Sequence, residues 1–335
     1  MERKFRSHLT QDERCQIYAY KSSGLSDRKI AKKIGVHPST VSRELKRNSG
    51  GRGYRYKQAD ELAKERRHNA SSVARVATLK VIQLITEMLK ATYASPVQIA
   101  GRLKLEHDIS ISHETIYRVI LDDRLKKGTL YLFLRRKGKK LWRRKPNTSG
   151  RGLIPNRRDI STRPAVAGLK EEAGHLEIDT IVGANHKGVI LSVVDKATKF
   201  TVLELLSAGT AELVTEALIR RISELKASGL TMSTITADNG KEFAKHGEVS
   251  QALEVDFFFA RPYRSCDRGL NEHTNGLVRQ FLPKKTDFTI ITHEQVAHIE
   301  WILNNRPRKS LNFKTPVEVV NAVLSHGSMS VAFRT

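Results

Sequence analysis

The chain has 335 residues and a formal net charge of +24, and this charge is unevenly distributed. Residues 1–170 contain 40 of the 59 Lys and Arg residues but 15 of the 35 acidic residues, so residues 171–335 are close to neutral. The first half therefore has the charge of a nucleic-acid-binding protein, and the alternative is a generally basic protein such as a ribosomal component.

The two cysteines, Cys15 and Cys266, do not form a Cys-x-x-Cys pair. They argue against a disulfide scaffold and a cysteine-rich zinc site, and they fit a reducing cytoplasm. No apolar stretch reaches the roughly 18 residues that span a membrane, so no membrane partner is expected.

Residues 1–50 have the pattern of a helix-turn-helix DNA-binding domain. Thr10-Gln-Asp-Glu13 is a capping box that predicts the start of a first helix. A turn at Gly35 follows a second helix, and Pro38 suits the first position of a third helix over 38–47, which would enter the major groove. A plain three-helix bundle with a solvated basic face is the alternative. The residues expected on the DNA-facing side are Ser39, Thr40, Arg43, Lys46 and Arg47.

A second helical, DNA-binding domain is predicted over residues 51–125. Helices are expected over 58–71 and 77–91, Ser95 precedes another, and Ser112 caps the last one. The alternative is a dimerisation or spacer bundle that does not contact DNA. The outward residues of the last helix that could contact DNA are His113, Thr115 and Arg118.

Residues 126–165 are predicted to be a basic linker. Positions 135–145 read Arg-Arg-Lys-Gly-Lys-Lys-Leu-Trp-Arg-Arg-Lys. Such a run contacts DNA phosphates, or it is a solvated linker that DNA orders. The candidates for phosphate contact are Arg135, Arg136, Lys139, Lys140, Arg143 and Arg144.

An α/β domain is expected over residues 166–325, followed by a tail over 326–335. Alternating apolar residues predict strands, and a 3.6-residue apolar period predicts a helix between the third and fourth strands. The chain is thus predicted to be multidomain, with an all-α first half and an α/β second half. The expected strands are 175–183, 189–195, 200–206, 233–237 and 255–258, with helices over 210–226 and from about Asp267.

Three acidic residues in this domain point to metal-dependent chemistry. Asp179 lies on the first predicted strand, Asp238 ends the fourth, and Glu272 lies in the next helix, 33 residues further on. Adjacent strands and a following helix can bring three carboxylates to one point. Two Mg²⁺ or Mn²⁺ ions held by carboxylates about 3.5–4 Å apart can activate a water or hydroxyl for attack on a phosphodiester. Taken singly, each residue has a simpler explanation as a turn or cap residue.

Polar neighbours are expected to support these carboxylates. Asn275 and Arg279 follow Glu272 at spacings of three and seven, so they share its helix face. We interpret Asp195 as a turn residue and Glu242 as a supporting residue at most. The residues expected to support the three carboxylates, without binding the metal themselves, are Asn239, Asn275 and Arg279.

With these motifs the chain resembles the IS-thirty family of bacterial insertion-sequence transposases, which have a retroviral-integrase-like catalytic core. The resemblance covers nearly the whole chain. A departure at Arg264-Ser-Cys266-Asp267, where a more aromatic stretch is expected, affects local DNA contacts. The segments that carry the resemblance are Leu176-Glu-Ile-Asp179, Asp238-Asn-Gly-Lys-Glu-Phe243, residues 268–283, Asn305-Arg-Pro-Arg-Lys309, Thr315-Pro-Val-Glu318 and the helix-turn-helix at 30–45.

The resemblance implies a ribonuclease-H-like core in which Asp179, Asp238 and Glu272 hold two Mg²⁺ or Mn²⁺ ions per active site. It implies double-stranded DNA as partner, both the terminal inverted repeats of an insertion sequence and the target. A strand is hydrolysed at each element end, and the freed 3′ hydroxyl then attacks a target phosphodiester.

Two ends must be cut together, so a homodimer or higher oligomer on DNA is expected, at the nucleoid in the bacterial cytoplasm. Two alternatives remain open. One is a sequence-specific repressor with an inactive ribonuclease-H-like domain, and the other is a general structure-specific nuclease.

Overall fold

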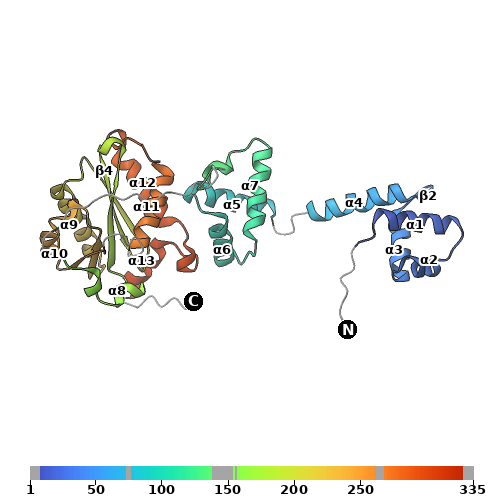
Figure 1. The fold of residues 1–335 in the computed structure, drawn as a ribbon, viewed down its shortest axis with the longest axis horizontal. Helices are drawn as coiled ribbons and strands as arrows, with labels where there is room; N and C mark the ends of the chain where they lie inside the picture. The colour runs from blue at the N-terminus through green and yellow to red at the C-terminus, as the bar shows by residue number, and fades with distance from the viewer. Residues whose placement is uncertain (1–7, 73–76, 138–153, 155–156, 262–267, 327–335) are drawn as a thin grey trace. The chain divides into compact units, whose positions relative to one another are not determined.

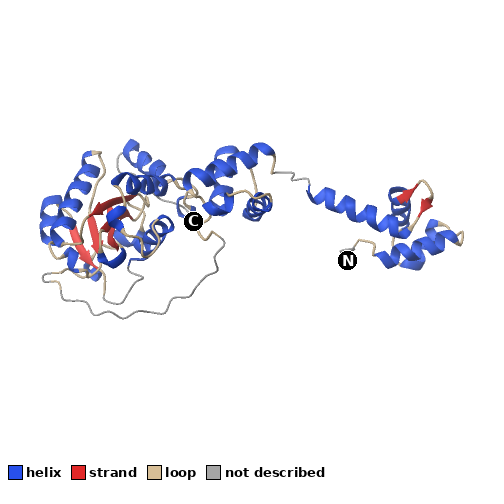
Figure 2. Cartoon of the chain, turned by 90° about the horizontal axis from the view of Figure 1, so that it is seen from above, coloured by secondary structure: helices blue, strands red, loops and turns tan. Residues whose placement is uncertain are grey.

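The described helices and strands form two compact units, one within residues 1–75 and the other within 76–335 (Figures 1 and 2). They confirm the predicted combination of an all-α first half and an α/β domain. Among the residues that the structure describes, no helix is long and apolar enough to cross a membrane. The computed structural model describes residues 8–72, 77–137, 154, 157–261 and 268–326.

The first unit is a small helical domain with a short hairpin. Thr10 and Glu13 close the predicted capping box, and Gly35 has a left-handed φ of 71° at the turn between the second and third helices. Its core contains Ile17, Ile30 and Val41. The elements are α1 (Gln11–Ser22), α2 (Asp27–Ile34), α3 (Pro38–Asn48), β1 (Ser49–Gly50), β2 (Gly53–Tyr54) and α4 (Tyr56–Ser72). Helix α4, which we expected in the second domain, packs against α1 and α3 instead.

A buried ionic network holds α1, α3 and α4 together. Arg14 Nε of α1 lies 2.8 Å from Glu44 Oε1 of α3, and Arg14 Nη1 lies 3.1 Å from Asp60 Oδ1 of α4. The Tyr54 hydroxyl donates to Glu44 Oε1 at 3.2 Å. Burial and the Glu44 carboxylate raise the pKa of Tyr54, so this hydroxyl keeps its proton. The interior of this domain therefore contains the charged groups of Arg14, Glu44 and Asp60 in addition to its apolar side chains.

Three helices open the second unit and pack as a bundle. Their apolar residues recur at helical spacing, and Ile85, Leu89, Ile99 and Ile116 are fully buried. Ser95 begins its helix as predicted, and its side chain accepts a hydrogen bond from the backbone N–H of Gln98, the third helical residue. The helices are α5 (Leu79–Thr92), α6 (Pro96–His107) and α7 (His113–Leu125).

The α/β domain is built on a five-stranded sheet of order β5-β4-β3-β6-β7. Strands β3, β4 and β5 are antiparallel neighbours, whereas β6 is parallel to β3 and β7 is parallel to β6. This mixed order with helices on both faces is the ribonuclease-H-like arrangement that we predicted. The elements are α8 (Val166–Leu169), β3 (His175–Val182), β4 (Val189–Asp195), β5 (Thr201–Leu206), α9 (Ala211–Ala227), β6 (Thr234–Ala237), α10 (His246–Leu253), β7 (Asp256–Phe259), α11 (Gly269–Phe281), α12 (His293–Asn305) and α13 (Pro316–His326).

The two faces of the sheet have separate apolar cores. Helices α9 and α10 cover one face and contact Leu176 and Ile178 of β3, while α11 and α12 cover the other and contact Ile181 (Figure 1). Side chains alternate along a strand, so Asp179 lies on the same face as Ile181. The sequence pattern of β3 thus directs Asp179 toward α11.

The three-helix bundle docks onto the α/β domain through specific contacts. Arg102 Nη1 of α6 donates to Glu318 Oε2 of α13 at 2.7 Å. Arg306 Nε donates to the Thr92 carbonyl oxygen at 2.7 Å. The ring of Tyr93 packs edge-on against Phe281, with ring centroids 4.9 Å apart. The bundle and the sheet domain therefore form one packed body.

Candidate active site

Two of the three predicted carboxylates meet where β3 and β6 run side by side. The two strands are parallel neighbours, and Glu177 of β3 pairs with Thr236 of β6. Asp179 lies two residues after Glu177, and Asp238 follows directly after the last residue of β6. The shared strand direction therefore carries both aspartates to the same region of the sheet.

A guanidinium cation joins these aspartates. Arg268 Nη1 lies 3.3 Å from Asp179 Oδ1, and Arg268 Nη2 lies 3.5 Å from Asp238 Oδ2. The side chains of Asp179, Asp238 and Arg268 are 17%, 11% and 12% exposed, so solvent screens this cluster weakly. Our sequence analysis missed Arg268 as a site residue. Arg268 lies directly before α11, and no pattern in the local sequence shows that its guanidinium reaches the aspartates.

The electrostatics of Asp179 favour a bound cation. Burial raises the pKa of the Asp179 carboxyl above its ordinary value, Arg268 opposes this shift, and the neighbouring Asp238 adds to it. An ionised carboxylate in this place is therefore costly unless positive charge lies beside it. In this structure Arg268 supplies that charge.

Hydrogen bonds fix the direction of the Asp179 carboxylate. Asn275 Nδ2 donates to Asp179 Oδ2 at 2.8 Å, and the Thr180 backbone N–H donates to Asp179 Oδ1 at 3.0 Å. The buried Ser192 hydroxyl holds Asn275 in turn, because it donates to Asn275 Oδ1 at 3.1 Å. The structure thus places Asn275 of α11 against Asp179.

The loop after β6 positions Asp238. The Gly240 backbone N–H donates to Asp238 Oδ1 at 2.8 Å, and Asn239 Nδ2 donates to the Ala260 carbonyl oxygen at 2.8 Å. A Cβ atom at Gly240 would lie 2.4 Å from Glu242 Oε2, so a larger residue here would displace the Glu242 carboxylate. Asn239 therefore anchors the loop rather than reaching the carboxylates.

Glu242 contacts the residue that follows Asp179. Its Oε1 accepts a hydrogen bond of 2.8 Å from the Thr180 hydroxyl, and Thr180 is the residue that follows Asp179. Because the Glu242 carboxylate also folds back over Gly240, it lies between the two segments that carry the aspartates.

Glu272 lies in the first turn of α11 and is exposed. Within the ranges that the structure describes, no three acidic, histidine or cysteine side chains are gathered closely enough to hold a metal ion. The structure therefore brings Asp179 and Asp238 together, but it does not add Glu272 to them. Arg268, the residue directly before α11, reaches both aspartates instead.

Arg279 is held away from the carboxylates. Its Nη2 donates to the Val182 carbonyl oxygen at 2.7 Å, and its guanidinium packs over the Phe288 ring at 5.5 Å. It therefore ties the carboxyl end of β3 to α11 and to the segment that follows it.

The similarity to known proteins identifies the family. A family model described as a helix-turn-helix domain matches residues 6–48. The transposase for insertion sequence element IS4351 of Bacteroides fragilis is 43% identical over 328 residues, which cover 97% of this chain and 99% of the relative. Transposase InsI for insertion sequence element IS30A of Escherichia coli (strain K12) is 32% identical over 323 residues, 94% of this chain and 83% of the relative. The chain belongs to the IS30 family of insertion-sequence transposases.

A solved structure is also similar to this IS30-family chain. It is the crystal structure of the catalytic core domain of BIV integrase, with 16% sequence identity and a TM-score of 0.34. The match covers 45% of this chain and 95% of that chain.

The helix-turn-helix of this IS30-family chain presents basic side chains on α3. Arg43, Lys46 and Arg47 are exposed, whereas Ser39 and Thr40 are half-buried near the start of the helix. On α7, His113 and Arg118 are exposed and Thr115 is half-buried. Arg135 and Arg136 are exposed after the helical bundle. The other basic-run candidates, Lys139, Lys140, Arg143 and Arg144, lie outside the described residues.

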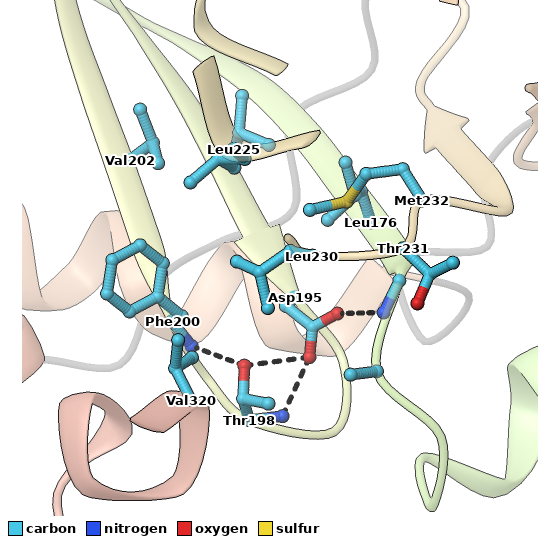
Figure 3. A pocket seen from close by; sticks show the side chains of 13 residues that line it. Leu176, Asp195, Thr198, Phe200, Val202, Leu225, Leu230, Thr231, Met232 and Val320 are labelled. Carbon is cyan, nitrogen blue, oxygen red and sulfur yellow. Dashed lines mark hydrogen bonds between the residues drawn. The ribbon is translucent and has the colours of Figure 1, made fainter. Parts of the chain in front are cut away.

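A small pocket at the other end of the sheet lacks the chemistry of an active site in this IS30-family chain (Figure 3). Its only acidic residue, among the lining residues described, is Asp195. The Asp195 carboxylate accepts hydrogen bonds from the backbone N–H groups of Gly174 at 2.7 Å and Thr198 at 2.7 Å. Asp195 is therefore a turn residue, as we predicted, and apolar side chains such as Leu230 fill the rest of the wall.

Proposed function

We propose that this chain is a DNA transposase that binds the terminal inverted repeats of its insertion sequence, cleaves the element ends and joins the 3′ hydroxyls to target DNA. The observation that carries the proposal is the pair Asp179 and Asp238, held around a cation on adjacent strands of a ribonuclease-H-like sheet. The high identity to insertion-sequence transposases over nearly the whole chain supports it.

The donors at this site fit a divalent cation. Asp179 and Asp238 offer carboxylate oxygens, and they already surround one positive charge, the Arg268 guanidinium. Together with Glu272 they would hold Mg²⁺ or Mn²⁺, two ions per active site in our proposal. Bound there, the ions supply Lewis-acid activation of the attacking oxygen and stabilise the leaving oxygen.

The remaining residues prepare the site and the DNA. Asn275 and Thr180 hold the Asp179 carboxylate in one orientation, and the Gly240 N–H does the same for Asp238. In this proposal α3 reads the element ends in the major groove. Phosphodiester hydrolysis and strand transfer need no covalent protein–DNA intermediate, so no Ser or Tyr nucleophile is required.

The test is strand cleavage and joining by purified protein on a labelled terminal-repeat duplex with Mg²⁺ or Mn²⁺. We expect both reactions in the wild type, and we expect Glu272→Gln to lose them while it keeps DNA binding. The matched control is Glu216→Gln, an exposed glutamate of α9 on the opposite face of the sheet. Equal activity of wild type and Glu272→Gln would remove Glu272 from the site. DNA binding without cleavage by either protein would favour a sequence-specific repressor.

Replacing Arg268 by glutamine is expected to destabilise the metal-free protein and to strengthen Mn²⁺ binding. The two aspartates then lose the guanidinium that lies between them, which costs about 1–3 kcal/mol. Added Mn²⁺ no longer competes with a guanidinium, so it should raise the unfolding temperature of the variant more than that of the wild type. Thermal unfolding in EDTA and in Mn²⁺ measures both effects.

The control for Arg268 is Arg220→Gln. Arg220 also lies between two carboxylates, 2.6 Å from Glu204 Oε1 and 3.2 Å from Glu224 Oε1, but its side chain is 49% exposed. Its removal is expected to change stability by at most about 1 kcal/mol. The same Mn²⁺ response in all three proteins would contradict the role given to Arg268.

A further inference from the structure

Two buried arginines lie in the segment between α12 and α13. Arg306 is 2% exposed and Arg308 is 7% exposed. Neither forms an ion pair with an acidic side chain within the part of the chain that the structure describes. Burial of an unpaired charge is unfavourable, so two like charges buried in the same place call for an anion.

Each of these arginines has an N–H group that finds no partner among the described residues. Arg306 donates from Nε to the Thr92 carbonyl oxygen at 2.7 Å and from Nη1 to Gln280 Oε1 at 3.3 Å, but its buried Nη2 has no hydrogen-bond partner. Arg308 donates from Nη2 to the Leu303 carbonyl oxygen at 3.0 Å, but its buried Nε has none. Neutral carbonyl and amide oxygens thus hold the two guanidinium groups in place without neutralising them.

The electrostatics agree with this arrangement. The pKa of Arg306 is lowered to about 9. Burial is the main cause, and the positive charges of Arg308 and Arg135 contribute to the same shift. Burial and Arg135 lower the pKa of Arg308 to about 10. Both guanidinium groups remain charged at neutral pH, but the protein holds these charges at a cost.

A third arginine completes the cluster beside α11. Arg135 is exposed, and its Nη2 lies 2.9 Å from the point where a Cβ atom on Gly276 would be. Glycine at this position therefore lets the guanidinium approach the helix backbone. Gly276 is four residues after Glu272, so the cluster lies next to the helix face that carries Glu272. Partial desolvation lowers the pKa of His273, and the positive charges of the three arginines lower it further.

We infer that Arg135, Arg306 and Arg308 form a receptor for a backbone phosphate of bound DNA. A phosphodiester carries the missing negative charge, and its oxygens can accept from the unpaired N–H groups of Arg306 and Arg308. Exposed Arg135 admits the phosphate from solvent. The inference rests on the proposed function, because it places the DNA strand beside α11 and the predicted catalytic carboxylates.

DNA binding in EDTA tests the receptor without any cleavage. We would measure the affinity for the terminal-repeat duplex by fluorescence anisotropy between 50 and 200 mM salt, for wild type, Arg308→Met and Arg135→Gln. Loss of one phosphate contact should weaken binding and reduce the slope of log K against log salt by about 0.9. The exposed Arg135 keeps the test valid if Arg308→Met does not fold.

The control is Arg102→Met, which removes an arginine of the same unit that already has carboxylate partners in Glu318 and Glu106. It should keep the wild-type salt slope. Unchanged slopes in Arg308→Met and Arg135→Gln would overturn the receptor, even if the wild type cleaves DNA. A reduced slope in a protein that does not cleave would keep the receptor and overturn the proposed activity.

Inorganic phosphate separates a DNA receptor from a site for free anions. If phosphate alone stabilises the wild type against heat and not Arg308→Met, while DNA slopes are equal, the cluster binds a free anion and our assignment to DNA is wrong. If Arg308→Met loses DNA affinity and is at least as heat-stable as the wild type without anions, the buried charge of Arg308 serves DNA binding and does not stabilise the fold. This result would support the receptor.

Discussion

Asp179→Asn should abolish strand cleavage and, at neutral pH, make the DNA-free protein more stable. Activity should fall by about three orders of magnitude or more, because a carboxylate central to the site is lost. Stability should rise by about 1 kcal/mol, or roughly 2–4 °C in unfolding temperature, because the variant no longer buries an ionised carboxylate beside Asp238. The amide oxygen can still accept the hydrogen bond that the Thr180 N–H donates.

The direction of the expected stability change follows from the pKa of Asp179. The folded-state pKa of Asp179 is raised above its ordinary value of 3.8, so the folded chain holds the proton to higher pH than the unfolded chain. The wild type therefore loses stability relative to the variant as pH rises from about 4 through the raised pKa, and the full difference is present above that pKa. Below about pH 4 the difference should disappear. Thermal unfolding across this pH range measures it.

Asp256→Asn provides the comparison for Asp179. Asp256 lies on the same sheet, but its side chain is 50% exposed and pairs with Arg158 at the surface. Its replacement should change neither cleavage nor the pH dependence of unfolding appreciably. An Asp179→Asn protein that is less stable than the wild type at pH 7 would show that Arg268 outweighs burial.

Arg14→Met should unfold the amino-terminal unit and eliminate binding to the terminal repeat. Arg14 is 4% exposed and reaches both Glu44 and Asp60, which are 8% and 5% exposed. Its removal leaves two buried carboxylates without their shared cation, a loss of about 3–5 kcal/mol. A small apolar core leaves this unit little reserve against such a loss.

Calorimetry of the full chain, together with binding to the terminal-repeat duplex, measures this effect. The transition of the unit that contains the sheet should be unchanged, while that of the amino-terminal unit should move to lower temperature or vanish. Lys21→Met removes an exposed pair with Asp27 on the same unit and should cost at most about 1 kcal/mol. Wild-type binding by Arg14→Met would mean that the network is dispensable.

The strands and helices were largely predictable because local chemistry determines them. The capping box at Thr10, the alternation over 175–183 and the apolar period over 210–226 each match an element to within one or two residues. The meeting of Asp179 and Asp238 was also predictable, since parallel neighbouring strands carry residues near their carboxyl ends to one edge.

Contacts between distant segments were not predictable in the same way. Arg268 is 89 positions from Asp179 in the sequence, and no local pattern shows that its guanidinium reaches two strands. The burial of Arg306 and Arg308 runs against the usual exposure of arginine, so composition predicts a surface loop there. The polar surface of helix α4 is compatible with packing against either neighbouring domain. The buried ion pair between Asp60 and Arg14 places α4 in the amino-terminal unit.

In the proposed reaction, the docking of the helical bundle onto the sheet domain would determine where DNA is cut. Because Arg102 holds Glu318 and Arg306 holds the Thr92 carbonyl, a DNA segment gripped by α7 would lie at a set distance from Asp179. The scissile bond would then lie a fixed number of base pairs from the DNA sequence that α7 contacts. Loosening the Arg102–Glu318 pair would scatter the cut sites over neighbouring nucleotides while the chemistry continued at its usual rate.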